Sequence, residues 1–99
     1  MKIYTLIKVE YTKDGIEFKA LYSARWLKEM QLRMETEVNR LWDEISEPVI
    51  DDMRANHEEY FDGDFKPPVP EDFYNKDMMG WTFDLMTVGF MILENDYLE

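Results

Sequence analysis

The chain has 99 residues, of which 45% are hydrophobic and 15% aromatic, enough to build one modest core and too many for an intrinsically disordered chain. It has 22 acidic and 11 basic residues, a net charge of −11, and no cysteine. These numbers exclude disulfides and thiolate chemistry, and the acidity disfavours direct binding to nucleic acid or to an anionic membrane. We expect a single domain over residues 1–99 and a cytoplasmic location.

The first predicted element is a β-hairpin over residues 3–22. Asp14 and Gly15 form a dipeptide that is typical of two-residue hairpin turns. With these two residues in the loop, Glu10 lies opposite Lys19, and apolar residues lie opposite one another on the other face. The residues expected to face the core are Ile7, Val9, Tyr11, Phe18, Ala20 and Tyr22.

The second predicted element is a long amphipathic helix over residues 24–45, with Ser23 as its N-cap. Apolar residues recur there at spacings of three and four, which places them in one stripe. These residues are Leu27, Met30, Met34, Val38, Leu41 and Ile45. Because proline interrupts helices, Pro48 is expected to end this helix, and Ser46 to cap a second, shorter one over residues 47–61.

Residues 57–77 are predicted to form an irregular loop. Gly63 and the run Pro67-Pro68-Val69-Pro70 are incompatible with regular helix or strand. Loops of this length in a compact domain are usually either functional or disordered. The aromatic rings distinguish this loop from a flexible glycine-serine linker, but they could cover the core or face a partner, and the sequence leaves both options open.

Residues 80–96 complete the chain with a predicted third strand, and a short helix over residues 86–93 is the alternative. The predicted fold is therefore α+β: a three-stranded, mainly antiparallel sheet packed on the long helix. The shorter helix and the acidic aromatic loop are expected at its edge.

Side chains for catalysis are scarce. The two serines are explained as helix caps, and His57 is the only imidazole. A metal site could use His57, Glu58, Asp62 and Asp64, but their spacing does not match a calcium loop of the EF-hand type. We therefore expect no catalytic residue, no metal and no cofactor.

The charge is unevenly distributed along the chain. Residues 1–40 have a net charge of +2 and residues 41–99 a net charge of −13. Acidic residues interleaved with aromatic ones, and stiffened by prolines, suggest a surface that binds a basic partner. The predicted partner-binding residues are Glu58, Glu59, Tyr60, Asp62, Asp64, Phe65, Glu71, Asp72, Tyr74 and Asp77.

The leading functional hypothesis is a non-enzymatic binding module that occupies a basic protein surface. In its sharpest form the protein is an inhibitor of the phage or mobile-element type, whose carboxylates imitate the phosphates recognised by a nucleic-acid-binding protein. A small metal- or carboxylate-dependent enzyme centred on His57 is one alternative. A self-associating structural protein, with a homodimer as its simplest form, is the other, because eight methionines and three tryptophans are many for one small core.

Overall fold

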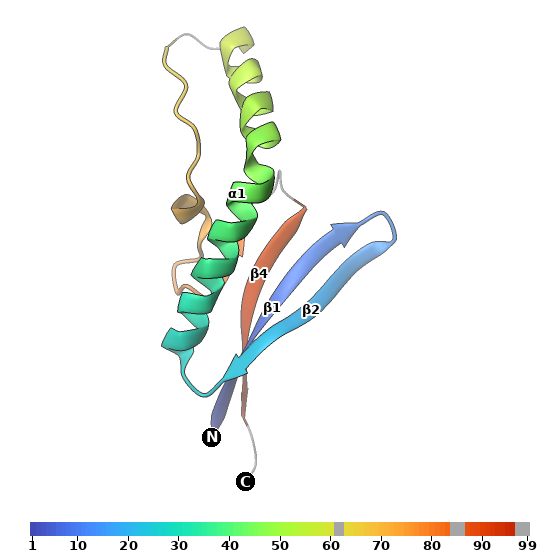
Figure 1. Cartoon of the computed structure of the whole chain (residues 1–99), viewed down its shortest axis with the longest axis vertical. Coiled ribbons are helices and arrows are strands. Elements are labelled where there is room, and N and C mark those ends of the chain that lie inside the picture. Colours follow the sequence, from blue (N-terminus) through green and yellow to red (C-terminus); the bar gives the residue numbers. More distant parts are fainter. Residues whose placement is uncertain (61–62, 84–86, 97–99) are drawn as a thin grey trace.

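The computed structural model describes residues 1–60, 63–83 and 87–96. One long helix packs on one face of a four-stranded antiparallel sheet with the strand order β2-β1-β4-β3 (Figure 1). The predicted α+β class is confirmed. In chain order, the elements are β1 (Lys2–Thr12), β2 (Gly15–Ala24), α1 (Leu27–Tyr60), the 3-10 helix η1 (Pro70–Phe73), β3 (Gly80–Thr82) and β4 (Val88–Asp96).

The predicted hairpin is confirmed, but its turn lies one residue earlier than expected. Thr12 pairs with Gly15, so Lys13 and Asp14 are the two turn residues. Neither of these has a positive φ, whereas Gly15 has a φ of 131°. Glycine adopts such a backbone conformation far more readily than other residues do. Gly15 therefore supplies the positive φ at the first residue of β2, directly after the two turn residues.

The earlier turn shifts the hairpin register by two residues. Val9 lies opposite Phe18 instead of Ala20. The expected acid–base pair is replaced by two acids, because Glu10 lies opposite Glu17. A turn dipeptide alone could not reveal this shift, since a move of two residues leaves every side chain on the same face of its strand.

The sheet meets α1 through the face opposite to the predicted one. Leu6 of β1 is fully buried beneath the helix, together with Phe90 and Ile92 of β4. Side chains alternate along a strand, so the odd-numbered residues of β1 point away from the helix. The prediction failed because both sets of positions in β1 contain bulky apolar residues, and alternation then does not select a face. The residues placed on the wrong side are Ile7, Val9, Tyr11, Phe18 and Ala20.

Tyr22 does face the helix as predicted, because a β-bulge precedes it. The register shifts between Leu6 and Ile7, which leaves Leu21 as the extra residue of β2. Beyond the bulge, the Tyr22 hydroxyl donates to a Glu37 carboxylate oxygen of α1 at 3.4 Å. The bulge thus turns the end of β2 toward the helix that follows it.

We call the side of the sheet away from α1 the open face. Strand alternation and the observed pairings assign its residues. They are Ile3, Thr5, Ile7, Val9 and Tyr11 of β1, Ile16, Phe18, Ala20 and Ser23 of β2, Gly80 and Thr82 of β3, and Gly89, Met91, Leu93 and Asn95 of β4.

The predicted C-terminal strand is in fact two strands. β4 pairs with β1 along most of its length, and the short β3 pairs with the other edge of β4. A Cβ atom at Gly89 would lie 3.0 Å from the Trp81 carbonyl oxygen, so glycine permits the close approach of these two strands. The alternative helix over residues 86–93 is wrong, because Val88–Asp96 is a strand.

The two predicted helices are one continuous helix. Pro48 lies inside α1, and Ser46 is buried within it instead of capping a second helix. Ser23 lies in β2, where its hydroxyl is 3.1 Å from the Thr5 hydroxyl, and it caps nothing. Proline disrupts a helix locally, but Ile45 and Val49 on either side of Pro48 pack on the same core and hold the helix across it.

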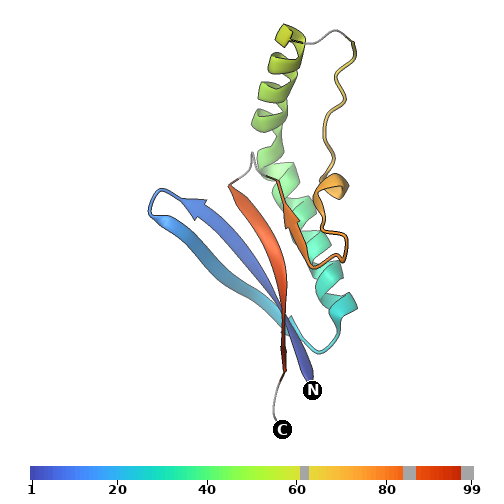
Figure 2. The same cartoon turned by 180° about the vertical axis from the view of Figure 1, so that it is seen from behind.

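The predicted stripe of the helix is confirmed. Met30, Met34, Val38 and Leu41 are buried against the sheet, and Leu27 and Ile45 pack at the ends of this core. Beyond the stripe, α1 projects past the sheet (Figures 1 and 2). The molecule measures 59 × 30 × 20 Å, and its radius of gyration of 16.2 Å exceeds the roughly 13 Å typical of a compact 100-residue domain.

Replacing Pro48 by alanine should raise the free energy of unfolding by about 1–3 kcal/mol. Alanine restores the hydrogen bond to the Glu44 carbonyl and removes the ring clash with the preceding turn. Denaturant unfolding measures the change. As a control, Pro67→Ala in the exposed irregular segment should change stability by less than about 1 kcal/mol. A destabilising Pro48→Ala variant would show that the proline is needed for the packing, and a neutral one would show that the proline does not weaken the helix.

Candidate functional site

A long irregular segment runs back along α1 and completes the helical layer. We call residues 63–77 the strap. The carbonyl oxygen of Gly63, at its start, lies 3.3 Å from His57 Nε2 near the end of the helix. The carbonyl oxygen of Asp77, at the far end, accepts from Gln31 Nε2 at 3.4 Å near the start of the helix. The strap is therefore antiparallel to α1 (Figure 2) and spans 26 helical residues, or about 39 Å.

Aromatic rings fasten the middle of the strap. Phe73 of η1 stacks on Phe83, with ring centroids 4.4 Å apart, and on Trp42 of α1, at 6.3 Å. Trp81 of β3 meets both Trp42 and Phe73 edge-on, at 6.2 and 6.5 Å. The Trp81 indole N–H also donates to the Pro70 carbonyl oxygen at 2.8 Å. The sequence left open whether the aromatic rings of residues 57–77 cover the core or face a partner, and the Phe73 ring covers the core.

The start of the strap is held by a smaller contact. The Phe65 ring lies 5.6 Å from the His57 ring, and the Arg54 guanidinium lies 5.5 Å from the Phe65 ring centroid. Such cation–π contacts at exposed sites contribute about 0.5–1 kcal/mol. Phe65 is therefore partly used in holding the strap on the helix.

Tyr74 is half-buried and follows η1. It pairs with Trp81 through an isolated β-bridge, and its buried hydroxyl has no hydrogen-bond partner among the described residues. Burial raises the pKa of Tyr74 to about 12, and the carboxylates of Glu35 and Glu71 add to the shift. The neutral phenol is favoured in this position, and Tyr74 packs against the core and pairs the strap with β3.

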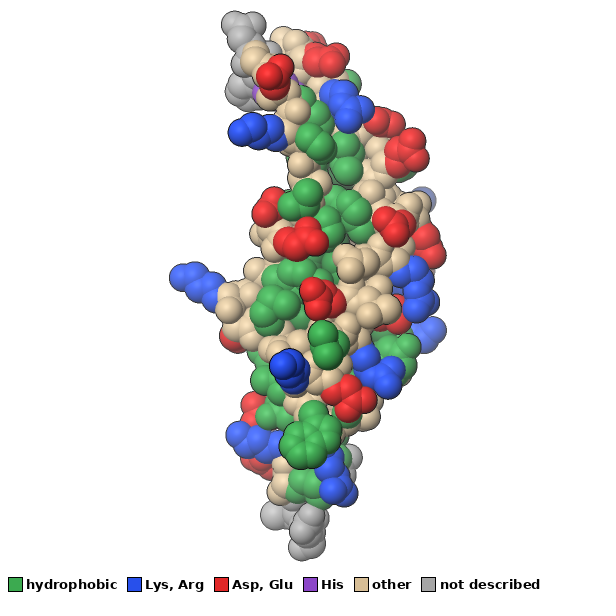
Figure 3. Space-filling model, turned by 60° about the vertical axis from the view of Figure 1, so that its left-hand side comes forward, with side chains coloured by type: hydrophobic (Ala, Val, Ile, Leu, Met, Phe, Trp, Pro, Cys, Tyr) green, Lys and Arg blue, Asp and Glu red, His purple; other side chains and the backbone are tan. Residues whose placement is uncertain are grey.

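The described carboxylates of the helix end and of the strap are all exposed, and we call this set of residues the acidic strip. Residues 43–77 include eleven acidic residues that the structure describes, all exposed, and three exposed bases. Carboxylates lie along this side of the molecule in Figure 3, with apolar side chains between them. The described acids are Asp43, Glu44, Glu47, Asp51, Asp52, Glu58, Glu59, Asp64, Glu71, Asp72 and Asp77.

The predicted site residues are separated into two groups along the strip. Glu58, Glu59 and Tyr60 form the last turn of α1, with Asp64 at the nearby start of the strap. Glu71 and Asp72 lie in η1, beside the level of Trp42, about 27 Å away along the helix axis from Tyr60. Asp77 lies farther still, and Asp62 is outside the described residues.

Sequence reasoning did not include the exposed acids in the middle of α1 among the candidate site residues. These acids are Glu44, Glu47 and Asp51, at spacings of three and four, and the predicted Glu58 follows seven residues later on the same face of α1. This spacing was visible in the sequence, but the expected break at Pro48 divided the pattern between two helices.

The surroundings of His57 do not resemble a metal centre. Within residues 1–60, 63–83 and 87–96, no three histidine, aspartate or glutamate side chains come close enough to share a metal ion. The His57 ring packs on Phe65 beside the Gly63 carbonyl. These contacts attach the strap to the helix.

No helix in the described part of the chain, α1 included, is apolar enough over a sufficient length to cross a membrane. No family model, curated protein or solved structure matches the chain.

The Tyr74 phenol should make stability depend on pH in the alkaline range. An unfolded tyrosine ionises near pH 10, whereas folded Tyr74 ionises near pH 12. The unfolded state loses its proton first, so this contribution to stability is complete below pH 10 and falls as the pH rises from 10 to 12. Tyr74→Phe should remove that fall, and should leave stability at neutral pH unchanged or raise it by about 1 kcal/mol.

The measurement is denaturant unfolding at several pH values, together with ultraviolet titration of the tyrosines. Tyr60→Phe is the control, because Tyr60 is 71% exposed. The assignment fails if Tyr60→Phe and Tyr74→Phe have the same pH dependence.

Proposed function

We propose that the protein is a non-enzymatic binding module whose acidic strip docks on a basic surface of a protein partner. The observation that carries this proposal is the density of unpaired carboxylates on a rigid support. Within the described residues of the strip, the ion pair formed by a lysine or arginine is Arg54 with Asp51, at 3.2 Å. Asp77 Oδ1 accepts the Met79 backbone N–H at 3.1 Å. The other carboxylates of the strip can attract an approaching cationic surface and raise its association rate.

The dimensions of the strip favour a partner that normally binds nucleic acid. One strand of B-form DNA carries a phosphate about every 3.4 Å along the axis, or about eleven over 39 Å. The strip displays eleven described carboxylates over about that length, seven of them on α1 and four on the strap. Three bases reduce the net charge of the strip, so its charge density is closer to that of a single DNA strand than to that of a duplex. On this basis, we propose that the partner is a nucleic-acid-binding protein whose site the strip would occupy.

The support of the carboxylates matters as much as their number. The end of α1 and the strap are joined by ring contacts at Phe65 and Phe73 and by the Trp81–Pro70 hydrogen bond. Carboxylates held in this way lose less conformational freedom on binding than those of a disordered acidic tail. The strip is thus suited to a partner with a fixed pattern of cationic groups.

The test is retention of proteins from an extract of the native host on the immobilised chain, at about 0.1 M and 1 M salt. The Debye length falls from about 10 Å to 3 Å over this range, so retained proteins should be basic and should elute at high salt. The variant Glu44→Gln, Glu47→Gln, Glu58→Gln should bind a purified retained protein about threefold to a hundredfold more weakly, at roughly 0.2–1 kcal/mol per carboxylate.

The control is the variant Asp14→Asn, Glu17→Gln, Asp96→Asn, which removes the same charge from the hairpin and β4. If both variants weaken binding equally, general charge and not the strip is responsible. Binding that is insensitive to salt would contradict the proposal.

A further inference from the structure

The open face of the sheet has no charged residue, although 33% of the chain is charged. The charged residues of the strands all lie on the α1 side, including Lys8 and Glu10 in β1 and Lys19 in β2. An antiparallel sheet with one solvated face normally carries its polar residues on that face. Here the charged residues lie beside the core on the α1 side, and the open face carries only uncharged residues, most of them apolar, which indicates that it is not built to remain in water.

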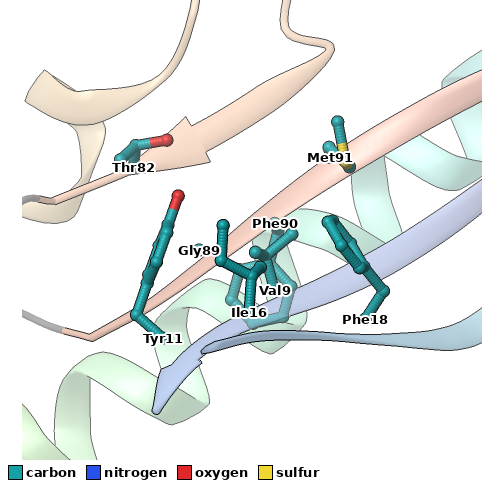
Figure 4. Close-up of a pocket in the computed structure, with 8 residues that line it drawn as sticks. All are labelled: Val9, Tyr11, Ile16, Phe18, Thr82, Gly89, Phe90 and Met91. Carbon is teal, nitrogen blue, oxygen red and sulfur yellow. The ribbon is translucent and has the colours of Figure 1, made fainter. Parts of the chain in front are cut away.

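Several large side chains of this face are exposed. Phe18 is 65% exposed and Ile16 is 54% exposed, while Val9, which pairs with Phe18, is buried. A hollow of about 170 Å³ lies among them, with Tyr11 on one side and Phe18 near Met91 on the other (Figure 4). Pockets for small ligands usually measure about 300–1,000 Å³, so this hollow is better suited to a side chain of another protein surface.

The total surface of the chain is also too large for its mass. It exposes 7361 Å², whereas a monomer of 12.0 kDa is expected to expose about 6,000 Å². The projecting end of α1 accounts for part of the difference. A standard protein interface removes about 800 Å² from each partner. The excess of roughly 1,400 Å² leaves room for one such interface.

The charge of the chain decides where two copies could meet. Each copy has a net charge of −11, so contact through the acidic strip would bring like charges together. The open face brings none together, and it lies on the opposite side of the sheet from α1. Face-to-face packing would therefore leave both acidic strips on the outside.

We propose that the open face packs against the open face of a second copy and forms a two-fold symmetric dimer. The two sheets would form a β-sandwich, with a helix-and-strap layer on each outer side. The exposed rings of one copy would fill the hollow of the other. This inference goes beyond the proposed function, since a dimer can form whether or not the strip binds a basic partner.

The test is the mass of the full chain in solution, measured by analytical ultracentrifugation at several concentrations in high salt, which screens repulsion between the copies. The wild type should have twice the mass of the 12.0 kDa chain. Phe18→Glu should shift the dimer to monomer. The matched control is Leu32→Glu, at a 56% exposed position on α1, which should leave the dimer intact.

A monomeric wild type at every concentration would overturn the proposal, and so would a dimer that survives Phe18→Glu. Circular dichroism shows whether the variants are folded. If Phe18→Glu does not fold, NMR of a mixture of isotope-labelled and unlabelled wild-type chains decides. Intermolecular contacts from Ile16, Phe18 and Met91 would support the dimer, and their absence, or contacts from α1 alone, would overturn it.

Discussion

The burial of Trp81 is the contact on which the arrangement of the other elements depends. Its side chain is completely buried between the sheet, α1 and the strap, and it meets rings from each of these parts. Its indole N–H finds a partner in the Pro70 carbonyl, so the polar end of the ring is satisfied as well. A buried tryptophan at this position joins β3 to the edge of the sheet and fixes the strap along the helix. The placement of Glu71 and Asp72 in η1 follows from it.

Charge and apolar surface are sorted onto opposite sides of this framework. The outer side of α1 and the strap carries the acidic strip, whereas the open face of the sheet carries no charge. Between them, on the α1 side of the hairpin, Lys8 lies opposite Lys19 and Glu10 opposite Glu17, with Lys8 and Glu10 3.3 Å apart. Like charges directly across strands weaken a hairpin, so its exposed apolar rings and backbone pairing must offset that cost. The two surfaces can serve two different partners without interfering with each other.

The parts of the fold that could be predicted are those with a strong local pattern. The hairpin followed from Asp14-Gly15 and the flanking alternation, and the helix stripe from Met30 to Leu41 followed from its spacing. The acidity of the second half was also plain. The continuous helix was not predictable in this way, because the cost of Pro48 is local whereas Ile45 and Val49 pack on a core that includes residues distant in sequence.

For the candidate site, residue type and exposure could be inferred, but spatial grouping could not. Glu58, Asp64, Glu71 and Asp77 are exposed, as acidic residues usually are, because desolvating a carboxylate is costly. Their separation along α1 depends on an antiparallel strap held by Trp42, Phe73 and Trp81. The same holds for the open face. Residue order along the chain establishes which side chains alternate along a strand, but the face that becomes buried depends on which side of the sheet the helix covers, and that is set by contacts between residues far apart in the sequence.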